Sequence, residues 1–337
     1  MKEAMFYRPE KNNAIVCELC NHHCRIQEGK RGICGVRENK NGVLYSLVYG
    51  RLIAENIDPI EKKPLFNFLP GSRAFSISTV GCNFHCLHCQ NYNISQYPHA
   101  HKGEIAGAER TAESVVEDAI RSGCASVCYT YVEPTIFYEF AYDCSLLAHD
   151  RGLKNVFVSN GYMTPDVTRH LAPVLDGINI DVKAFTDNFY KKVCKARLQP
   201  VLDNVRLMHE LGVWVEVTTL IIPGLNDSGK ELRDIAGFIR SVSPTIPWHV
   251  TAFHPTYNMM DRRPTPAATL QKAREIGQEE GLYYVYEGNI PGQGGENTYC
   301  PGCGAELISR FGFSISKNDL ADGRCSKCGQ PIDGVWS

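Results

Sequence analysis

Three cysteines on one short loop are the residues of this chain that most directly imply a chemistry. Cys82, Cys86 and Cys89 are spaced by three residues and then by two. A [4Fe–4S] cubane that only carries electrons takes four thiolates, so three thiolates leave one iron free to bind a cofactor or a substrate. The loop follows residues 74–80, an apolar and β-branched run that predicts a buried strand.

A zinc knuckle is the alternative interpretation of this loop, because Cys-x-x-Cys pairs commonly bind zinc. A structural zinc site needs a second pair of ligands nearby, and the region after the loop offers none. That region instead alternates between strand and helix patterns, with polar residues at the strand ends. A barrel of parallel strands carries its active site at these ends.

The alternation runs from about residue 73 to residue 292. The predicted strands are Phe75–Thr79, Ser126–Thr130, Asn155–Ser159, Gly177–Asp181, Trp214–Ile221 and Trp248–Ala252, with Tyr283–Tyr286 as a candidate for a seventh. The predicted helices are Ala112–Arg121, Pro134–His149, Pro165–Val174, Ser228–Arg240 and Pro266–Glu280. Six βα units are too few for a closed eight-stranded barrel, so we expect an α/β fold with a partial (β/α)6 TIM-like barrel.

Polar side chains follow four of these strands. Glu133 follows the second strand, Asn160 the third, Asp181 and Lys183 the fourth, and His254 the sixth. Each also has a purely structural interpretation. Glu133 could stabilise a helix N-terminus, Asp181 and Lys183 could form an ion pair at the barrel rim, and His254 could be a solvated rim residue.

Two cysteine-rich segments flank the barrel and divide the chain into three expected domains. Residues 1–72 form an N-terminal metal-binding cap with a predicted hairpin through Val43–Tyr49, residues 73–292 the core, and residues 293–337 a zinc-ribbon module.

The C-terminal segment contains two Cys-x-x-Cys-Gly knuckles, Cys300/Cys303 and Cys325/Cys328. This spacing is typical of a tetrahedral four-thiolate site with a hairpin between the knuckles, and it favours zinc over a rubredoxin-type iron. The module is too small to fold on its own hydrophobic core, so we expect its metal to be required for folding.

The N-terminal segment contains Cys17, Cys20, Cys24 and Cys34. Four cysteines suffice for a zinc site, in which His22 or His23 could replace a thiolate, or for a second, fully ligated [4Fe–4S] cluster that relays electrons. The spacing is compatible with both. Zinc is favoured here, because no relay is needed if the barrel cluster faces its electron donor directly.

The composition of the chain limits the classes of protein to which it can belong. The chain has 337 residues, a formal net charge of −2 and fifteen cysteines. This charge gives no indication of nucleic-acid or anionic-membrane binding. No signal peptide or membrane span is visible, so we expect a cytoplasmic protein whose cysteines bind metal as thiolates. The four cysteines outside the groups are interpreted as inert buried thiols: Cys124, Cys128, Cys144 and Cys194.

The three-cysteine loop after a first strand resembles the radical S-adenosylmethionine (SAM) superfamily. Over nearly its whole length the chain resembles the AmmeMemoRadiSam-system radical SAM enzymes, which are relatives of pyruvate formate-lyase activating enzyme. The motifs that carry this resemblance are Gly32-Ile-Cys-Gly-Val-Arg-Glu-Asn39, Asp58-Pro-Ile-Glu-Lys-Lys-Pro-Leu65, Gly81-Cys-Asn-Phe-x-Cys-x-x-Cys-Gln-Asn91, Ile94-Ser-Gln96 and Asn297-Thr-Tyr-Cys-Pro301.

The resemblance implies a [4Fe–4S] cluster on the three-cysteine loop with SAM at its open iron. Glu133 corresponds to the carboxylate of the family's Gly-Gly-Glu-Pro element, which accepts a hydrogen bond from the SAM amino group. Residues 130–132, Thr-Tyr-Val, replace the small residues of that element. Asn160, Asp181 and Lys183 resemble positions that hold the ribose and carboxylate of SAM, and His254 is a further candidate for contact with it.

Two further positions bear on the comparison with the activating enzymes. Residues 221–227, Ile-Ile-Pro-Gly-Leu-Asn-Asp, match the turn that approaches the adenine in those enzymes, and Thr218 stands where they often carry a basic residue.

The expected reaction is reductive cleavage of SAM. A donor of the flavodoxin or ferredoxin type reduces the cluster, SAM is cleaved to methionine and a 5′-deoxyadenosyl radical, and the radical abstracts hydrogen from an unidentified substrate. Two alternatives remain: a glycyl-radical-enzyme activase acting on a partner protein, and a non-catalytic, metal-dependent module that binds protein or nucleic acid. Partners of the Memo and AMMECR types are implied by the resemblance alone.

Overall fold

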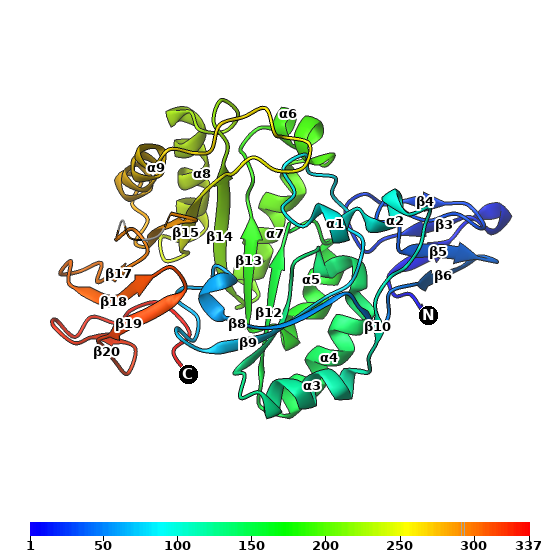
Figure 1. Cartoon of the computed structure of the whole chain (residues 1–337), viewed down its shortest axis with the longest axis horizontal. Coiled ribbons are helices and arrows are strands. Elements are labelled where there is room, and N and C mark those ends of the chain that lie inside the picture. Colours follow the sequence, from blue (N-terminus) through cyan, green and yellow to red (C-terminus); the bar gives the residue numbers. More distant parts are fainter. Residues whose placement is uncertain (291, 293) are drawn as a thin grey trace.

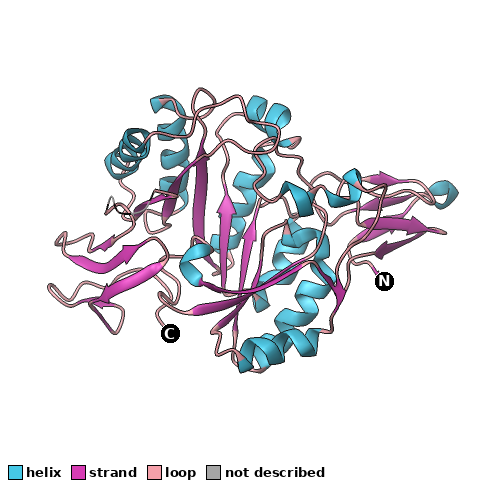
Figure 2. Ribbon diagram, in the orientation of Figure 1, coloured by secondary structure: helices cyan, strands magenta, loops and turns pink. Residues whose placement is uncertain are grey.

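A computed structural model describes residues 1–290, 292 and 294–337. One eight-stranded sheet forms its centre, in the order β16-β15-β14-β13-β12-β11-β9-β8 (Figures 1 and 2). The sheet contains β8 (Ala54–Pro59), β9 (Arg73–Ser78), β11 (Ser126–Tyr129), β12 (Lys154–Ser159), β13 (Gly177–Asp181), β14 (Trp214–Ile221), β15 (Trp248–Ala252) and β16 (Val285–Gly288). β8 is antiparallel to β9, and the other neighbours pair in parallel.

The predicted partial α/β barrel is confirmed. Within the described residues the edge strands β8 and β16 do not pair with each other, so the sheet is open. β13, β14 and β15 have the predicted bounds, and β16 provides the seventh parallel strand two residues later than expected. β8 joins this sheet along its whole length, although the expected domain boundary after residue 72 placed it in the cap.

Helices alternate with the parallel strands and cover the sheet (Figure 1). The longer helical segments are α3 (Ala112–Arg121), η3 (Pro134–Phe137) running into α4 (Tyr138–Asp150), α5 (Pro165–Leu171), α7 (Gln199–Glu210), α8 (Gly229–Val242) and α9 (Ala267–Glu279). The shorter ones are η1 (Lys11–Asn13), η2 (Ile60–Lys62), α1 (Tyr92–Ser95), α2 (Tyr97–Ala100), η4 (Ala172–Val174), α6 (Asp187–Phe189) and the π-helical η5 (Tyr190–Cys194).

Helix α7 was not predicted. Its N-cap residue, Leu198, makes no side-chain cap hydrogen bond, so the Ser, Thr, Asp or Asn that signals a helix start is missing. No described helix combines the length and the apolar character that a bilayer span requires.

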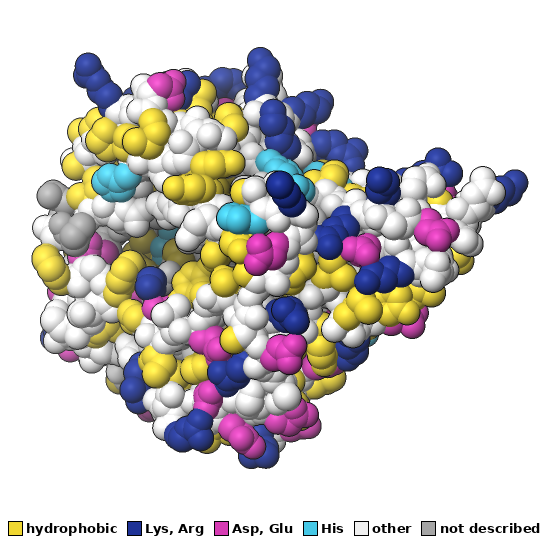
Figure 3. Space-filling view, turned by 45° about the vertical axis from the view of Figure 1, so that its right-hand side comes forward, with side chains coloured by type: hydrophobic (Ala, Val, Ile, Leu, Met, Phe, Trp, Pro, Cys, Tyr) yellow, Lys and Arg dark blue, Asp and Glu magenta, His cyan; other side chains and the backbone are white. Residues whose placement is uncertain are grey.

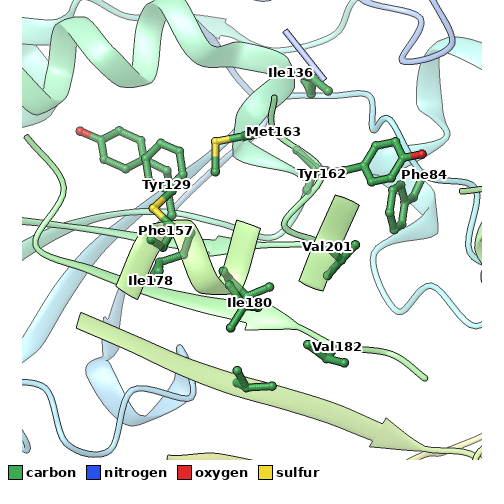
Figure 4. Close-up of a cluster of buried hydrophobic side chains, with 14 of the residues drawn as sticks. Phe84, Tyr129, Ile136, Phe157, Tyr162, Met163, Ile178, Ile180, Val182 and Val201 are labelled. Carbon is green, nitrogen blue, oxygen red and sulfur yellow. The ribbon is translucent and has the colours of Figure 1, made fainter. Parts of the chain in front are cut away.

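The barrel core is apolar and well filled (Figure 4). Ile178 and Ile180 of β13 are fully buried, as are Phe157 of β12 and Val201 of α7. Phe84, from the three-cysteine loop, packs edge-on against Tyr162 with ring centroids 5.1 Å apart. The loop is therefore anchored to the same core as the strands that face it.

The N-terminal cap is built from short antiparallel strands and projects from the body of the molecule, with charged side chains of both signs (Figures 1 and 3). One sheet contains β1 (Lys2–Glu3), β6 (Val43–Ser46) and β5 (Arg37–Lys40), in that order. A second sheet contains β2 (Tyr7–Pro9), β3 (Ile15–Cys17) and β4 (Arg25–Ile26). Strand β7 (Arg51–Leu52) pairs with β10 (Ala108–Glu109). A hairpin is present, but it is formed by β5 and β6 around a turn at Asn41 and Gly42, which both have positive φ. The predicted hairpin through Val43–Tyr49 therefore began too late, because Val43–Ser46 is the second strand of the hairpin and not the first.

The C-terminal ribbon packs on the barrel. Its strands are β17 (Thr298–Tyr299), β18 (Glu306–Phe311), β19 (Ser314–Asn318), β20 (Leu320–Ala321) and β21 (Arg324–Cys325). Its buried side chains share one cluster with Phe66, Tyr284 and Tyr286 of the preceding chain. Arg310 Nη2 also donates to the Phe66 carbonyl at 2.8 Å, so ribbon and barrel are continuous in the core.

Candidate functional site

A cavity of about 520 Å³ opens where the parallel strands end. Cys82, Cys86 and Cys89 line it from the loop after β9, and the segments that follow β11, β12 and β13 complete the wall. Its volume lies within the range of small-molecule and cofactor sites. Four predicted polar residues line this same cavity: Glu133, Asn160, Asp181 and Lys183.

The three-cysteine loop begins at a position that only glycine can occupy. Gly81 has a φ of +98°, and a Cβ there would lie 2.6 Å from Val36 Cγ1 and 2.8 Å from the Cys34 carbonyl oxygen. A larger residue would collide with the cap, so this contact fixes where the loop leaves β9.

The π-helical turn η5 holds the middle of the loop. His85 and Leu87 donate their backbone N–H groups to the carbonyls of Cys194 and Val193, at 3.1 and 3.0 Å. A hydrogen bond with the Cys194 thiol lowers the pKa of Cys86. The sequence interpretation of Cys194 as an inert buried thiol therefore missed its contact with the loop, because nothing in the sequence places residue 194 near residue 86.

Glu133 is buried and accepts four hydrogen bonds. Its Oε1 accepts from Thr135 N at 3.1 Å, Thr135 Oγ1 at 2.5 Å and Ser159 Oγ at 2.8 Å, and its Oε2 accepts from Asn160 N at 2.7 Å. Burial raises the pKa of Glu133, although these hydrogen bonds oppose the shift. Burial also raises the pKa of Cys82, and the charge of Glu133 adds to this effect. The carboxylate therefore caps the N-terminus of η3 and also lines the cavity. The first position is the one that the structural interpretation of Glu133 predicts, and the second is the one that a contact with SAM needs.

Asn160 connects two walls of the cavity. Its side-chain Nδ2 donates to Asn83 Oδ1 at 2.8 Å, and its Oδ1 accepts from Tyr162 N at 3.1 Å. Asn83 follows Cys82 directly, so this amide ties the end of β12 to the three-cysteine loop.

Asp181 and Lys183 form the ion pair that their spacing suggests, with Lys183 Nζ 2.8 Å from Asp181 Oδ2. Burial alone would lower the pKa of Lys183, but the negative charges of Asp181 and the Cys86 thiolate raise it. The ammonium therefore stays charged next to the three thiols. Such a group counters the negative charge that thiolates bring into a buried site.

The sequence analysis missed a second charged group at the cavity, in which Lys62 and Lys63 line the wall and Asp58 pairs with both of them. Asp58 accepts from Lys63 Nζ at 2.6 Å and Lys62 Nζ at 2.9 Å, and it also contacts the hydroxyl of Tyr131. Burial alone would raise the pKa of Asp58, but the hydrogen bonds from Lys63, Tyr131 and Lys62 lower it. Tyr131 has a positive φ of 64°, at one of the positions where the related motif has small residues. The Asp58 motif was recognisable in the sequence, but its contact with Tyr131 was not.

His254 is the predicted residue that the structure does not bring to the cavity, since it is exposed and absent from the lining. His88, inside the three-cysteine loop, lines the cavity instead, and burial together with the charge of Lys183 lowers its pKa to about 3. The hydroxyl of Thr218 also lines the cavity and has no hydrogen-bond partner in the structure. Phe313 contributes to the wall from the β18–β19 hairpin of the ribbon.

The four ribbon cysteines come together as their spacing predicts. Their ligand atoms all lie within 4.8 Å of one another, with Cys300 Sγ 3.6 Å from Cys328 Sγ and Cys303 Sγ 3.7 Å from Cys325 Sγ. This group could bind one metal ion. The four N-terminal cysteines line a different, smaller cavity between the cap and the barrel.

Comparisons with known proteins agree with this geometry. The model of the radical SAM superfamily matches residues 76–239. Uncharacterized protein MJ0808 of Methanocaldococcus jannaschii is 50% identical over 338 residues, which are 99% of this chain and 100% of that protein. Pyruvate formate-lyase-activating enzyme of Clostridium pasteurianum is 25% identical over 186 residues, covering 51% of this chain and 71% of that enzyme. Among solved structures, Streptococcus suis SuiB bound to S-adenosylmethionine superposes with a TM-score of 0.52 at 13% identity, covering 68% of this chain and 53% of that one.

Residues 76–239, which contain the three-cysteine loop and the cavity residues Glu133, Asn160, Asp181 and Lys183, belong to the radical SAM superfamily. The similarity of the chain to pyruvate formate-lyase-activating enzymes is distant. Membership of this superfamily supports an enzyme and implies a [4Fe–4S] cluster and SAM as cofactors. The residues fit both groups, because three thiols on one loop share a cavity with an acid, an amide and an ion pair.

Proposed function

We propose that this chain holds a site-differentiated [4Fe–4S] cluster on Cys82, Cys86 and Cys89 and binds SAM in the cavity of about 520 Å³. The observation that carries the proposal is the convergence of three thiols, without a fourth at the same loop, on a cavity with charged walls. With SAM bound, the reduced cluster supplies a 5′-deoxyadenosyl radical that removes a hydrogen atom from the substrate.

The residues of the cavity supply binding and positioning. Glu133 accepts from the SAM amino group at the side of the carboxylate that faces the cavity, and Asp181, Lys183 and Asn160 hold the ribose and carboxylate. Buried side chains such as Phe84, His88 and Val132 form part of the wall, and shielding from water protects a reactive intermediate. His254 is exposed, so any contact with SAM would need a movement of its loop.

The finer assignment follows the sequence motifs. We assign the chain to the AmmeMemoRadiSam-system enzymes, with a flavodoxin- or ferredoxin-type electron donor and partners of the Memo and AMMECR types. The three domains at residues 1–72, 73–292 and 293–337 belong to the same proposal. Glycyl-radical activase activity is the second candidate, favoured by similarity to a putative glycyl-radical enzyme activating enzyme of M. jannaschii, MJ1632, at 23% identity over 63% of this chain and 80% of that protein.

The binding roles are tested by SAM affinity measured anaerobically. Asp181→Ala should weaken SAM binding, whereas Asp203→Ala, an exposed carboxylate on α7, should leave it unchanged. Both variants should retain the iron content of the wild type. Unchanged affinity in Asp181→Ala would show that this carboxylate serves only its ion pair with Lys183.

A further inference from the structure

The four cysteines of the N-terminal cap surround a chamber of their own. Cys17 ends β3, Cys20 and Cys24 lie in the loop before β4, and Cys34 precedes β5. All four line the chamber, together with apolar side chains: Leu19, Ile26, Ile33 and Ile136. Thiols gathered in an apolar enclosure are suited to hold a metal centre away from water.

The separation of the sulfur atoms distinguishes this chamber from the ribbon site. Ligands about 2.3 Å from one tetrahedral zinc ion lie about 3.8 Å from each other, and the ribbon thiols meet this condition at 3.6 and 3.7 Å. Among the described residues, the ribbon thiols are the one group of three or more cysteine, histidine or acidic residues whose ligand atoms fall within 4.8 Å of one another. The N-terminal thiols, with or without His22 and His23, are therefore not gathered around one point in the way that the ribbon thiols are.

The barrel loop provides an internal comparison. Cys82, Cys86 and Cys89 also fail the 4.8 Å condition among the described residues, and they lie on the loop to which the superfamily assigns a [4Fe–4S] cluster. In a cubane each thiolate binds a different iron, so the sulfurs stand farther apart than around one ion. The N-terminal thiols thus share the wide spacing of the barrel loop and lack the close spacing of the ribbon.

The volume of the chamber that the N-terminal thiols line also favours a cluster over a single ion. The chamber has about 20 Å³ in which the centre of a water-sized sphere fits. About 10–15 Å³ is enough to hold a water molecule. All four thiols line this space without closing on one another, as a centre larger than one ion requires.

Two buried donors in the chamber wall lack an acceptor. Arg37 Nε and Asn83 Nδ2 have no hydrogen-bond partner in the structure, and each residue is 1% exposed. The other guanidinium nitrogens of Arg37 are used, by Glu139 at 2.8 Å and by the Met5 carbonyl at 2.7 Å. The sulfides of an iron–sulfur cluster accept hydrogen bonds, which would satisfy both donors.

The chamber lies against the three-cysteine loop. Asn83, the residue after Cys82, lines it, and His22 Nε2 donates to the Asn83 carbonyl at 2.8 Å. Gly81, the residue before Cys82, lies so close to the Cys34 carbonyl that a Cβ added at Gly81 would collide with it. The chamber and the three-cysteine loop are therefore in direct contact through Gly81 and Asn83.

We propose that Cys17, Cys20, Cys24 and Cys34 bind a second [4Fe–4S] cluster, which passes single electrons to the cluster on the barrel loop. A low-potential one-electron donor reduces the N-terminal cluster, and that cluster is reoxidised when the electron moves on, with no bond made or broken. The cluster itself is independent of the proposed SAM chemistry; only the electron transfer rests on it. This replaces the zinc interpretation of the N-terminal cysteines.

The test is iron, sulfide and zinc analysis of anaerobically reconstituted full-length protein. The wild type should hold about eight iron and eight sulfide atoms per chain, and the Cys82→Ser/Cys86→Ser/Cys89→Ser variant about four of each. Cys20→Ser/Cys34→Ser should also lose about half of the iron, whereas Cys124→Ala, a buried thiol outside all three groups, should retain all of it. About four iron atoms in the wild type with two zinc ions would overturn the proposal, and this result does not depend on whether a variant folds.

Electron paramagnetic resonance tests the electron path separately from SAM cleavage. When both clusters are reduced in the wild type, their spins should interact and broaden the spectrum, and each single-cluster variant should lose this broadening. A wild-type spectrum equal to the sum of the spectra of the two variants would overturn the electron-transfer step. Neither measurement uses SAM. A protein that holds both clusters but does not cleave SAM would therefore contradict the proposed function and leave this inference standing.

Discussion

Replacing Glu133 by glutamine removes the charge that we propose to bind the SAM amino group while keeping the size of the side chain. The three hydrogen bonds to Oε1 can persist on the glutamine oxygen. The glutamine amide would then face Asn160 N, which donates to Oε2 at 2.7 Å in the native chain, and this donor would lose its acceptor. One buried donor without a partner costs about 1–3 kcal/mol of folding free energy.

Loss of the charge-assisted hydrogen bond to SAM should cost a further 1.5–3 kcal/mol, or about ten- to a hundredfold in affinity. The assay is equilibrium SAM binding to anaerobically reconstituted protein. Thr135→Val is the matched control, because it removes a hydrogen bond to Oε1 and leaves the charge in place. We expect this control to lower stability with SAM affinity within a fewfold of the wild type. Equal losses of affinity in both variants would refute a direct role of the Glu133 charge.

The pH dependence of binding gives the same test a second readout. Burial raises the pKa of Glu133 above the ordinary 4.5 of a glutamate. If the ionised carboxylate binds SAM, wild-type affinity is full above this raised pKa and falls as the pH is lowered through it. Glu133→Gln should lack this fall, and an identical pH profile in the two proteins would contradict the assignment.

Asp58→Asn should destabilise the fold by about 3–5 kcal/mol, because it leaves the 1% exposed ammonium of Lys63 without its charged partner. Since the lysines hold the pKa of Asp58 below 3.8, this contribution is present above that pH and is lost as the pH falls below it. Urea unfolding of this variant and of the more exposed Lys62→Gln should show a large loss only in the first; equal losses would contradict the pairing. In the ribbon, Cys303→Ser/Cys328→Ser should remove about one zinc that survives air oxidation of the iron sites, measured by elemental analysis. Iron at the ribbon, seen as rubredoxin-like absorption, would overturn the zinc assignment.

The sequence predicted the barrel well where strands are β-branched and bounded by turn residues. β13, β14 and β15 are such segments, and their predicted and observed bounds agree. β8 was missed because Ala54–Pro59 is largely polar and ends in proline, so its pairing with β9 comes from tertiary contact and not from local preference.

Part of the candidate site could also be predicted, because the predicted strands determine where several of its residues lie. Asp181 is the last residue of β13 and Glu133 lies four residues beyond β11, and such residues meet at one end of the sheet because the strands are parallel. His254 lies two residues beyond β15 in a loop, where the strand no longer determines its direction, and it is exposed. The contact of Asp58 with Tyr131 depends on how distant segments pack, which no local pattern encodes.

The central claim is that the three-cysteine loop supports reductive cleavage of SAM. Its most direct test is product analysis after anaerobically reconstituted protein has been reduced by a strong one-electron donor in the presence of SAM. We predict 5′-deoxyadenosine and methionine from the wild type and neither product above background from Cys82→Ala, Cys86→Ala or Cys89→Ala. Cleavage of SAM at the wild-type rate by any of these variants, or its absence from wild-type protein loaded with iron and sulfide, would contradict the claim.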